Sequence, residues 1–366
     1  MPAFLRFAAV LGRTTVVTLV VGVGASVAAF ALDRLGMSQT AVFVVSAVAL
    51  ATLAVLIGQG TDQLGQRFGP GATGILQSAL GNLPELFISI FALQAGLVVV
   101  VQTALIGSIL ANTLLVLGLA FVVGGLRHGT QRFHAPSVRT MATLLLLAVA
   151  ALAIPTLATA PGEPDAGHQV DLSVIVSIVL LVVFAASVPF SLGGGPGAHA
   201  ELAEAESPAW PLGLALGILA AGGIGAALTS DLFVEALKPT MASLGLSEAF
   251  VGLVVVAIAG NAVENVVGIR AAAANKTDLA ISLILNSSLQ VAIALTPALV
   301  LLSLVIGGGA LTLVLSPLLL GAVLLATILV AVIVFDGESN WLEGLALLGL
   351  YVIIAASVWY GPPIRP

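Results

Sequence analysis

The chain has 366 residues, of which 60% are hydrophobic and only 8% are charged, and its formal net charge is −6. A water-soluble domain of this length cannot bury so much apolar surface, so the composition indicates an integral membrane protein. The apolar runs have the length of about 20 residues that a spanning helix needs, and the alternating pattern of a membrane β-barrel is absent. The lack of cysteine excludes disulfides and thiolate metal sites.

The apolar pattern predicts eleven transmembrane helices, and the predicted fold class is an all-α polytopic membrane protein. The first apolar run is followed by Asp33 and Arg34 rather than by a small-residue cleavage site, so we expect it to be retained as a helix. The predicted spans cover residues 11–32, 38–58, 70–95, 97–124, 138–158, 169–190, 210–230, 246–273, 277–304, 310–334 and 341–360.

These spans predict four parts of the chain. A leading helix at 1–37 precedes a first five-helix repeat at 38–190, and an acidic cytoplasmic linker at 191–209 joins it to a second five-helix repeat at 210–366. Because five is an odd number, the second group crosses the membrane in the opposite direction to the first. Inverted repeats with a substrate site near the midplane are a common plan of secondary transporters.

The linker opens with Gly193-Gly194-Gly195-Pro196 and continues with Glu201, Glu204 and Glu206. This pattern predicts a hinge followed by a short acidic helix. We interpret the three glutamates as a solvated face, and a regulatory Ca²⁺ site is the alternative.

The basic residues predict the orientation of the chain. With a cytoplasmic N-terminus, eight of the eleven Lys and Arg residues lie on the cytoplasmic side, as the positive-inside rule favours. These eight are Arg6, Arg13, Arg67, Arg127, Arg132, Arg139, Arg270 and Lys276. Short loops and an Ala/Leu/Val/Gly bias favour a prokaryotic inner (plasma) membrane over a vacuolar-type membrane.

Two similar pentapeptides lie inside apolar runs, 179 positions apart: G-N-L-P-E at 81–85 and G-N-A-V-E at 260–264. Their acids, Glu85 and Glu264, are the only two that fall deep within such a run. A carboxylate at the bilayer centre costs about 2.5–3.5 kcal/mol on insertion scales, so both are functional candidates. The alternative is a structural ion pair, but Arg270 lies about 9 Å further along the helix and is expected to snorkel to the surface.

Each motif also predicts a break in its helix. Pro84 has no backbone donor, and Gly81 and Gly260 add local freedom, so the break is expected to be strongest in the first motif. Asn82 and Asn261 lie three residues before their glutamates and share a helix face with them. Interhelical hydrogen bonding is the structural alternative for these two asparagines.

The fourth and ninth spans add further oxygen-bearing side chains. Ser108 and Asn112 share one helix face, as do Ser287 and Gln290, and the two serines are again 179 positions apart. A structural role is weighed almost equally for these four residues. Gln102, near the outer end of the fourth span, is a weaker candidate for the pathway.

Two carboxylates together with amide, hydroxyl and freed carbonyl oxygens reach the six to eight oxygens that Ca²⁺ favours. All four histidines are assigned to loops, which argues against zinc or copper: His128, His134, His168 and His199. An empty site with two desolvated carboxylates is a poor state for crossing the membrane because the two charges repel each other. A divalent cation or protons can neutralise it, so we hypothesise that Ca²⁺ and H⁺ compete for one site and are exchanged by alternating access.

The segment from Gly81 to Gly118 resembles the first signature region of the Ca²⁺/H⁺ antiporters, and the segment from Gly260 to Pro297 resembles their second. These antiporters form part of the wider cation/Ca²⁺ exchanger superfamily, and the resemblance covers essentially the whole chain. It implies ten core helices in two inverted halves plus one leading helix. It also implies that the second and seventh spans slide as a gating bundle.

The same resemblance implies that Glu85 and Glu264 are the central carriers of Ca²⁺ and H⁺. The implied supporting residues are Asn82, Asn261, Ser108 and Ser287, with Gln102 and Gln290 lining the pathway. Three positions depart from the family pattern. Asn265 stands where a His is usual, Asn286-Ser287 stands for Gly-Ser, and Ala111-Asn112 stands for Ser-Asn.

A Ca²⁺/H⁺ antiporter is therefore the leading interpretation, and a Na⁺/Ca²⁺ exchanger of the same superfamily is the alternative. A cation channel is disfavoured because the acids lie on full spans of inverted halves. An enzyme is not expected, because no His-Glu-x-x-His helix is present. We expect no cofactor, with Ca²⁺ as the transported substrate. The expected partners are Ca²⁺, H⁺ and membrane lipid, with a homo-oligomer as an open alternative and no nucleic acid.

Overall fold

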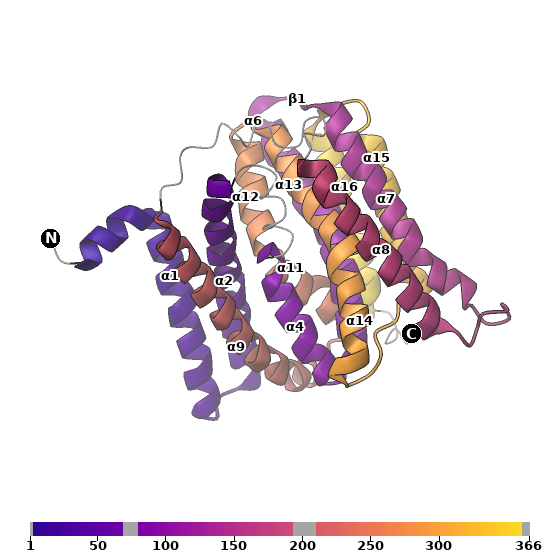
Figure 1. Ribbon diagram of the computed structural model, residues 1–366, viewed down its shortest axis with the longest axis horizontal. Helices are drawn as coiled ribbons and strands as arrows, with labels where there is room; N and C mark the ends of the chain where they lie inside the picture. Colours follow the sequence, from indigo (N-terminus) through magenta and orange to yellow (C-terminus); the bar gives the residue numbers. More distant parts are fainter. Residues whose placement is uncertain (1–2, 69–79, 193–209, 361–366) are drawn as a thin grey trace.

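The computed structural model describes residues 3–68, 80–192 and 210–360, and it is almost entirely helical (Figure 1). The helices of the first half are α1 (Ala3–Arg34), α2 (Gln39–Phe68), α4 (Leu83–Gln94), α5 (Val98–Leu110), α6 (Leu117–His128), α7 (Ala135–Ala158) and α8 (Gln169–Leu192). Those of the second half are α9 (Leu212–Leu244), α10 (Glu248–Phe250), α11 (Ala257–Gly260), α12 (Ala262–Ala273), α13 (Thr277–Gln290), α14 (Thr296–Ile306), α15 (Pro317–Ile333) and α16 (Trp341–Tyr360).

Three spans contain a wider, π-helical segment in their middle. The segment η2 (Ala111–Val116) joins α5 to α6, η4 (Val251–Val256) joins α10 to α11, and η5 (Val291–Leu295) joins α13 to α14. Such segments are rare and occur frequently at functional sites. Two of them, η2 and η5, occupy corresponding places in the two halves of the chain.

The described residues contain eight helices that are long and apolar enough to cross a membrane, and a ninth span if the bent pair Glu248–Gly260 and Glu264–Ala273 is counted as one. The shorter apolar helices α4 and α15 occupy the places of the third and tenth predicted spans. The all-α polytopic fold class is therefore confirmed. The expected hinge and acidic helix of the linker, at 193–209, lie outside the described residues.

Two helices are longer than predicted. The second span was expected to end at residue 58, but α2 continues to Phe68; the seventh was expected to end at residue 230, but α9 continues to Leu244. The apolar run that predicts each span ends at the first polar residues. The helix itself continues because one side of each extension is still buried, for example at Leu64 and Leu237. At about 1.5 Å per residue, α9 is about 50 Å long, more than a hydrocarbon core requires.

One group of helices, formed by α1, α2 and α9, lies together at one side of the molecule (Figure 1). Phe43 of α2 stacks on Phe233 of α9 with ring centroids 4.7 Å apart. Gly222 allows close approach, since a Cβ there would stand 3.0 Å from Ile57. The helix α9 also packs against α4, which follows the first pentapeptide.

The opposite side is tied together at the helix ends. A two-stranded antiparallel ladder pairs β1 (Gln131–Arg132) with β2 (Glu338–Ser339), and an ion pair of 3.0 Å joins Arg132 to Glu338. This ladder connects the loop before α7 to the loop before α16. One histidine expected in a loop, His128, is instead the last residue of α6, where it lies within 3.0 Å of the carbonyl of Ala273.

The connection between α14 and α15, residues 307–316, is not helical, although it is packed among helices. Its buried side chains alternate along the chain at Leu311, Leu313 and Leu315. Non-helical backbone is tolerated at membrane depth only where it is buried in protein or lines a water-filled cavity, so that its polar groups find hydrogen-bond partners. The N–H of Leu313 donates to Ser173 Oγ and the N–H of Leu315 donates to Thr156 Oγ1, both at 2.9 Å.

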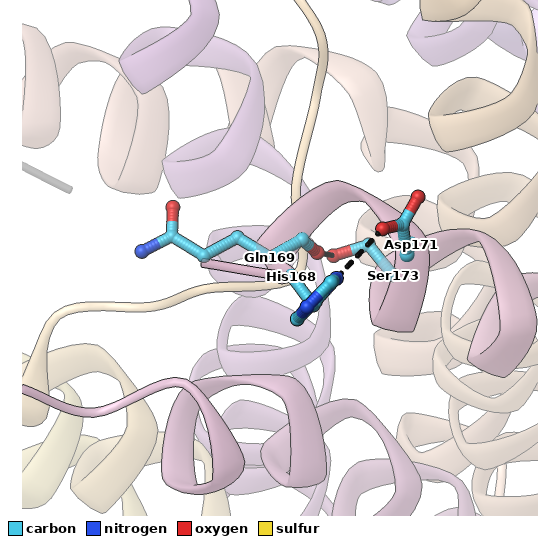
Figure 2. Close-up of polar contacts among 4 residues, drawn as sticks. All are labelled: His168, Gln169, Asp171 and Ser173. Atoms are coloured by element: carbon cyan, nitrogen blue, oxygen red, sulfur yellow. Dashed lines mark hydrogen bonds and ion pairs between the residues drawn. The ribbon is translucent and has the colours of Figure 1, made fainter. Parts of the chain in front are cut away.

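These two acceptors belong to α8 and α7, so the connection is held from several sides. Figure 2 shows Ser173 beside its second partner, the carbonyl oxygen of Gln169, to which the hydroxyl donates at 2.6 Å. In the preceding turn His168 lies 3.1 Å from Asp171, at the N-terminal end of α8. The carbonyls of Thr312 and Val314 accept from Gln102 of α5, and that of Leu313 accepts from Thr156 Oγ1 of α7.

We expect Ser173→Ala to lower the free energy of unfolding by about 1–3 kcal/mol, because it leaves the buried N–H of Leu313 without an acceptor. Thermal unfolding of the purified protein in detergent measures the change. Ser357→Ala is the matched control, since that exposed hydroxyl only donates to Ile353 of its own helix. Equal stability of the two variants would contradict this role of Ser173.

Candidate ion-binding site

Both pentapeptides form the start of a helix. Asn82 precedes α4 with φ −92° and ψ 16°, and Asn261 precedes α12 with φ −90° and ψ 25°. The two glutamates, Glu85 and Glu264, therefore occupy the same place in the first turn of their helices. The N-terminal end of a helix favours negative charge, so each helix start supports its carboxylate.

The backbone at Asn82 and at Asn261 is alike, and the second motif contains the predicted break; the helix expected before the first motif, at 70–79, lies outside the described residues. In the second motif, which has no proline, the chain bends by 62° between the helical segments Glu248–Gly260 and Glu264–Ala273. Pro84 lies in the first turn of α4 rather than within a kinked helix. A proline costs nothing there because a first-turn N–H has no intrahelical partner.

Glu85 is buried, with 6% of its surface exposed, and two side chains donate to the same carboxylate oxygen. Ser108 Oγ of α5 and Asn261 Nδ2 of the second motif each lie 2.9 Å from Glu85 Oε1. The other oxygen, Oε2, has no hydrogen-bond partner among the described residues. The first glutamate is thus held by donors from both halves of the chain.

Glu264 is held by the equivalent serine. Ser287 Oγ of α13 donates to Glu264 Oε1 at 3.1 Å, and the sequence separation of this pair is 23, as it is for Glu85 and Ser108. The repeat seen in the sequence is therefore also a repeat of contacts.

Asn112, in η2, connects the two halves. Its side-chain Nδ2 donates to Asn261 Oδ1 at 2.8 Å and to Ser287 Oγ at 3.1 Å. A continuous series of hydrogen-bonded side chains therefore runs from Glu85 to Glu264, through Asn261, Asn112 and Ser287. Asn112 is fully buried, and its Oδ1 has no partner within the described part of the chain.

Three of the predicted site residues lie outside this series. Asn82 is buried, but its Nδ2 finds no hydrogen-bond partner among the described residues. Gln290 is buried at the end of α13 and, within the described ranges, makes no hydrogen bond to the series. Gln102 donates to the carbonyls of Thr312 at 2.8 Å and Val314 at 3.2 Å, which belong to the α14–α15 connection.

The two motif glycines have unequal surroundings. A Cβ on Gly260 would overlap Glu85 Cγ, so the absence of a side chain lets the second motif approach the first carboxylate. At Gly81, in contrast, no described atom lies within 4 Å of the corresponding position. Gly260 is therefore required by close approach, whereas no described residue approaches Gly81 in this way.

The structure adds one residue that the sequence did not single out as part of the site. Asp62, on the extension of α2, is near enough to Glu264 for their negative charges to repel each other. It was missed because the second span was expected to end at residue 58. A prediction that continued this helix to Phe68 would have placed Asp62 on the same helix as the span. Asn265 donates from Nδ2 to the carbonyl of Ile258 at 3.3 Å, across the bend of the second motif.

Comparison with known proteins agrees with this fold. The family described as sodium/calcium exchanger protein matches residues 38–193 and 214–360. A Ca²⁺/H⁺ antiporter of Synechocystis sp. is 36% identical over 92% of this chain and 95% of its own length. The Ca²⁺/H⁺ antiporter ChaA of Bacillus subtilis is 36% identical over 86% of this chain and 90% of its own length.

A solved structure also has this fold. The crystal structure of the Ca²⁺/H⁺ antiporter protein YfkE superposes with a TM-score of 0.81 at 31% identity, over 94% of this chain and 99% of that one. The fold is thus that of a multi-pass, all-helical membrane protein. The chain belongs to the sodium/calcium exchanger family, and the resemblance of its two motifs to the Ca²⁺/H⁺ antiporters is confirmed.

We expect Gly260→Ala to impair both stability and ion exchange, because the added methyl group forces Glu85 away from Asn261. Overpacking of this kind costs about 1–3 kcal/mol. Thermal unfolding and Ca²⁺ flux in proteoliposomes measure the two effects. Gly81→Ala is the control from the other half, and we expect it to be much milder. Equal losses in both variants would show that close approach at Gly260 is unimportant.

Proposed function

We propose that this chain exchanges Ca²⁺ for H⁺ across a membrane by alternating access at a single site that contains Glu85 and Glu264. The observation that carries the proposal is the series of hydrogen bonds that joins these two carboxylates without a basic side chain. Arg270, the nearest base along α12, is exposed. The two negative charges must therefore be balanced by bound cations or protons.

The neutral groups around the glutamates suit a hard cation. Within the described residues, no group of three or more His, Cys, Asp or Glu could hold a metal ion, so two carboxylates must be supplemented by neutral oxygens. Asn112 Oδ1 and Glu85 Oε2 are buried acceptors without a partner among the described residues. Ca²⁺ accepts amide, hydroxyl and carboxylate oxygens in flexible arrangements.

The same donors allow protons to replace Ca²⁺. Ser108 and Asn261 turn hydrogens toward Glu85, an arrangement that suits a carboxylate without a metal ion. For Ca²⁺ to bind, the serine hydroxyl and the asparagine amide must turn their oxygens toward the ion. Their hydrogen bonds to Glu85 are then replaced by contacts with Ca²⁺. A protonated carboxyl group also removes the charge, so Ca²⁺ and H⁺ exclude each other electrostatically.

Access to the site is proposed to change by movement of α2 and α9 relative to the helices that carry the site. The group formed by α1, α2 and α9 contacts the rest through α4, α11 and α12, which begin or end at the two motifs. Asp62 of α2 is exposed and interacts electrostatically with Glu264, and we propose that it attracts cations toward the site.

With the N-terminus in the cytoplasm, the end of α2 that carries Asp62 lies on the cytoplasmic side. This orientation, the prokaryotic inner membrane and the four-part division of the chain remain proposals, based on the basic residues and the repeat. Asn82, Gln102 and Gln290 are proposed as supporting residues rather than direct ligands, since none of them takes part in the hydrogen-bonded series.

We expect Glu85→Gln and Glu264→Gln to reduce Ca²⁺ uptake driven by a proton gradient by about 100-fold or more, because each removes a charged ligand and a proton carrier. The measurement is ⁴⁵Ca²⁺ uptake into proteoliposomes with an imposed pH difference. Glu343→Gln is a control, since that glutamate accepts from the backbone of Asn340 outside the site. Full uptake by either site variant would contradict the mechanism.

The same vesicles separate the alternative function. With the pH clamped and a Na⁺ gradient imposed, a Ca²⁺/H⁺ antiporter moves little Ca²⁺. Movement of Ca²⁺ that follows the Na⁺ gradient would instead favour a Na⁺/Ca²⁺ exchanger.

Asp62→Asn tests the approach to the site. We expect KM for Ca²⁺ to rise about fivefold at low salt, with a smaller rise at high salt, because the residue acts by long-range attraction. The maximal rate is expected to change much less. Asp171→Asn, at the start of α8, removes the same charge and serves as the control. A loss of maximal rate without any change in KM would contradict the proposal that Asp62 attracts Ca²⁺ to the site.

A further inference from the structure

A shallow groove lies between α7 and α15, away from the ion-binding site. Leu146 of α7 and Ile328, Ala331 and Val332 of α15 line it, together with Phe335 just after that helix. Ile328, Val332 and Phe335 are 45%, 66% and 63% exposed, so the groove faces outward from the bundle. In a membrane protein such a surface meets the acyl chains of lipids.

One end of the groove carries a positive charge. Arg139 lies seven residues before Leu146 on the same face of α7, about 10 Å along the helix axis. Its guanidinium group stacks on the ring of Phe335, with 4.2 Å from the central carbon to the ring centroid. Its Nε donates to the carbonyl oxygen of Phe335 at 2.6 Å.

These two contacts orient the Arg139 side chain but do not neutralise its positive charge. Its terminal nitrogens make no hydrogen bond, and it forms no ion pair, within the described part of the chain. The neighbouring carboxylate of Asp336 accepts instead from the N–H of Glu338 at 3.0 Å. The guanidinium group can therefore bind an external anion with its two free nitrogens.

We propose that this groove binds an anionic phospholipid, with one acyl chain along Leu146, Ile328 and Val332 and the headgroup phosphate on Arg139. Arg139 lies in the second turn of α7, near the helix end where the lipid headgroups begin. The apolar groove and the charged end thus match the two parts of one lipid molecule. Basic pockets between transmembrane helices bind anionic headgroups in this manner.

The geometry also explains why a free anion is a poor alternative. A small anion would gain only the contact with Arg139, in water, where such a contact is weak. A zwitterionic lipid would fill the groove, but its own positive charge would weaken the attraction to Arg139. Preference for an anionic headgroup is therefore the property that distinguishes this site.

The test uses the full-length protein purified in detergent, with dioleoyl phosphatidylglycerol and dioleoyl phosphatidylcholine as probes and native mass spectrometry as the readout. We expect the wild-type protein to prefer phosphatidylglycerol by about fivefold, the contribution of one basic residue near a membrane surface. Arg139→Gln should abolish the preference. Arg127→Gln, an exposed arginine in the last turn of α6, should retain it.

Ala331→Phe tests the apolar half of the site, and we expect it to weaken binding of both lipids to a similar degree because the new ring fills the groove. Inorganic phosphate should not displace the bound lipid. Ca²⁺ flux in proteoliposomes establishes that each variant is folded. If Arg139→Gln does not fold, Arg139→Lys replaces it. The lysine cannot stack on Phe335 as the guanidinium group does, so the preference for phosphatidylglycerol should then be reduced. A preference that survives the change at Arg139, or displacement by phosphate, would overturn the proposal.

Discussion

The structure depends on one constraint: two carboxylates lie inside a membrane protein, and no basic side chain among the described residues forms an ion pair with them. Their negative charge is instead stabilised by hydrogen-bond donors and by the N-terminal ends of helices. Each glutamate is in the first turn of a helix, and each accepts from a serine 23 residues further along the chain. Because burial without compensation is costly, the surrounding helices must hold these donors in place, and only a mobile cation or proton can complete the balance.

The repeat produces this arrangement twice, but the centre of the site is not symmetrical. Asn261 bonds to Glu85, Ser108 and Asn112, whereas its counterpart Asn82 remains outside the series. The residue 179 positions after Asn112 is Val291, which has no polar atom to offer. The side-chain amide of Asn112 therefore bridges both halves. When one glutamate changes its hydrogen-bond partner, the shared side chains transmit the change to the other glutamate. Such coupling is what competition between one divalent cation and protons requires.

The rest of the molecule divides into helices joined by side-chain hydrogen bonds and a group, α1, α2 and α9, for which we propose movement. The α14–α15 connection is fixed by side chains of α5, α7 and α8, and the β1–β2 ladder ties neighbouring loops together. On the other side, α1, α2 and α9 pack mainly on one another. Side-chain hydrogen bonds specify one geometry, whereas apolar contacts between helices allow sliding at small cost, so the contact at the two motifs is where alternating access can operate.

The sequence by itself determined the membrane class, the all-helical fold and the matching positions of the two glutamates, because hydropathy and a fixed spacing are local properties of the chain. It also indicated the break at the second motif, where the chain bends by 62° without a proline. Only the tertiary structure decided which polar residues meet. Asn112 reaches Asn261 from 149 positions away, Gln102 turns to a connection 210 positions away, and Asp62 comes to Glu264 on a helix extended beyond its apolar run. Contacts between distant segments follow from how the helices pack, and a pattern along one chain does not contain that information.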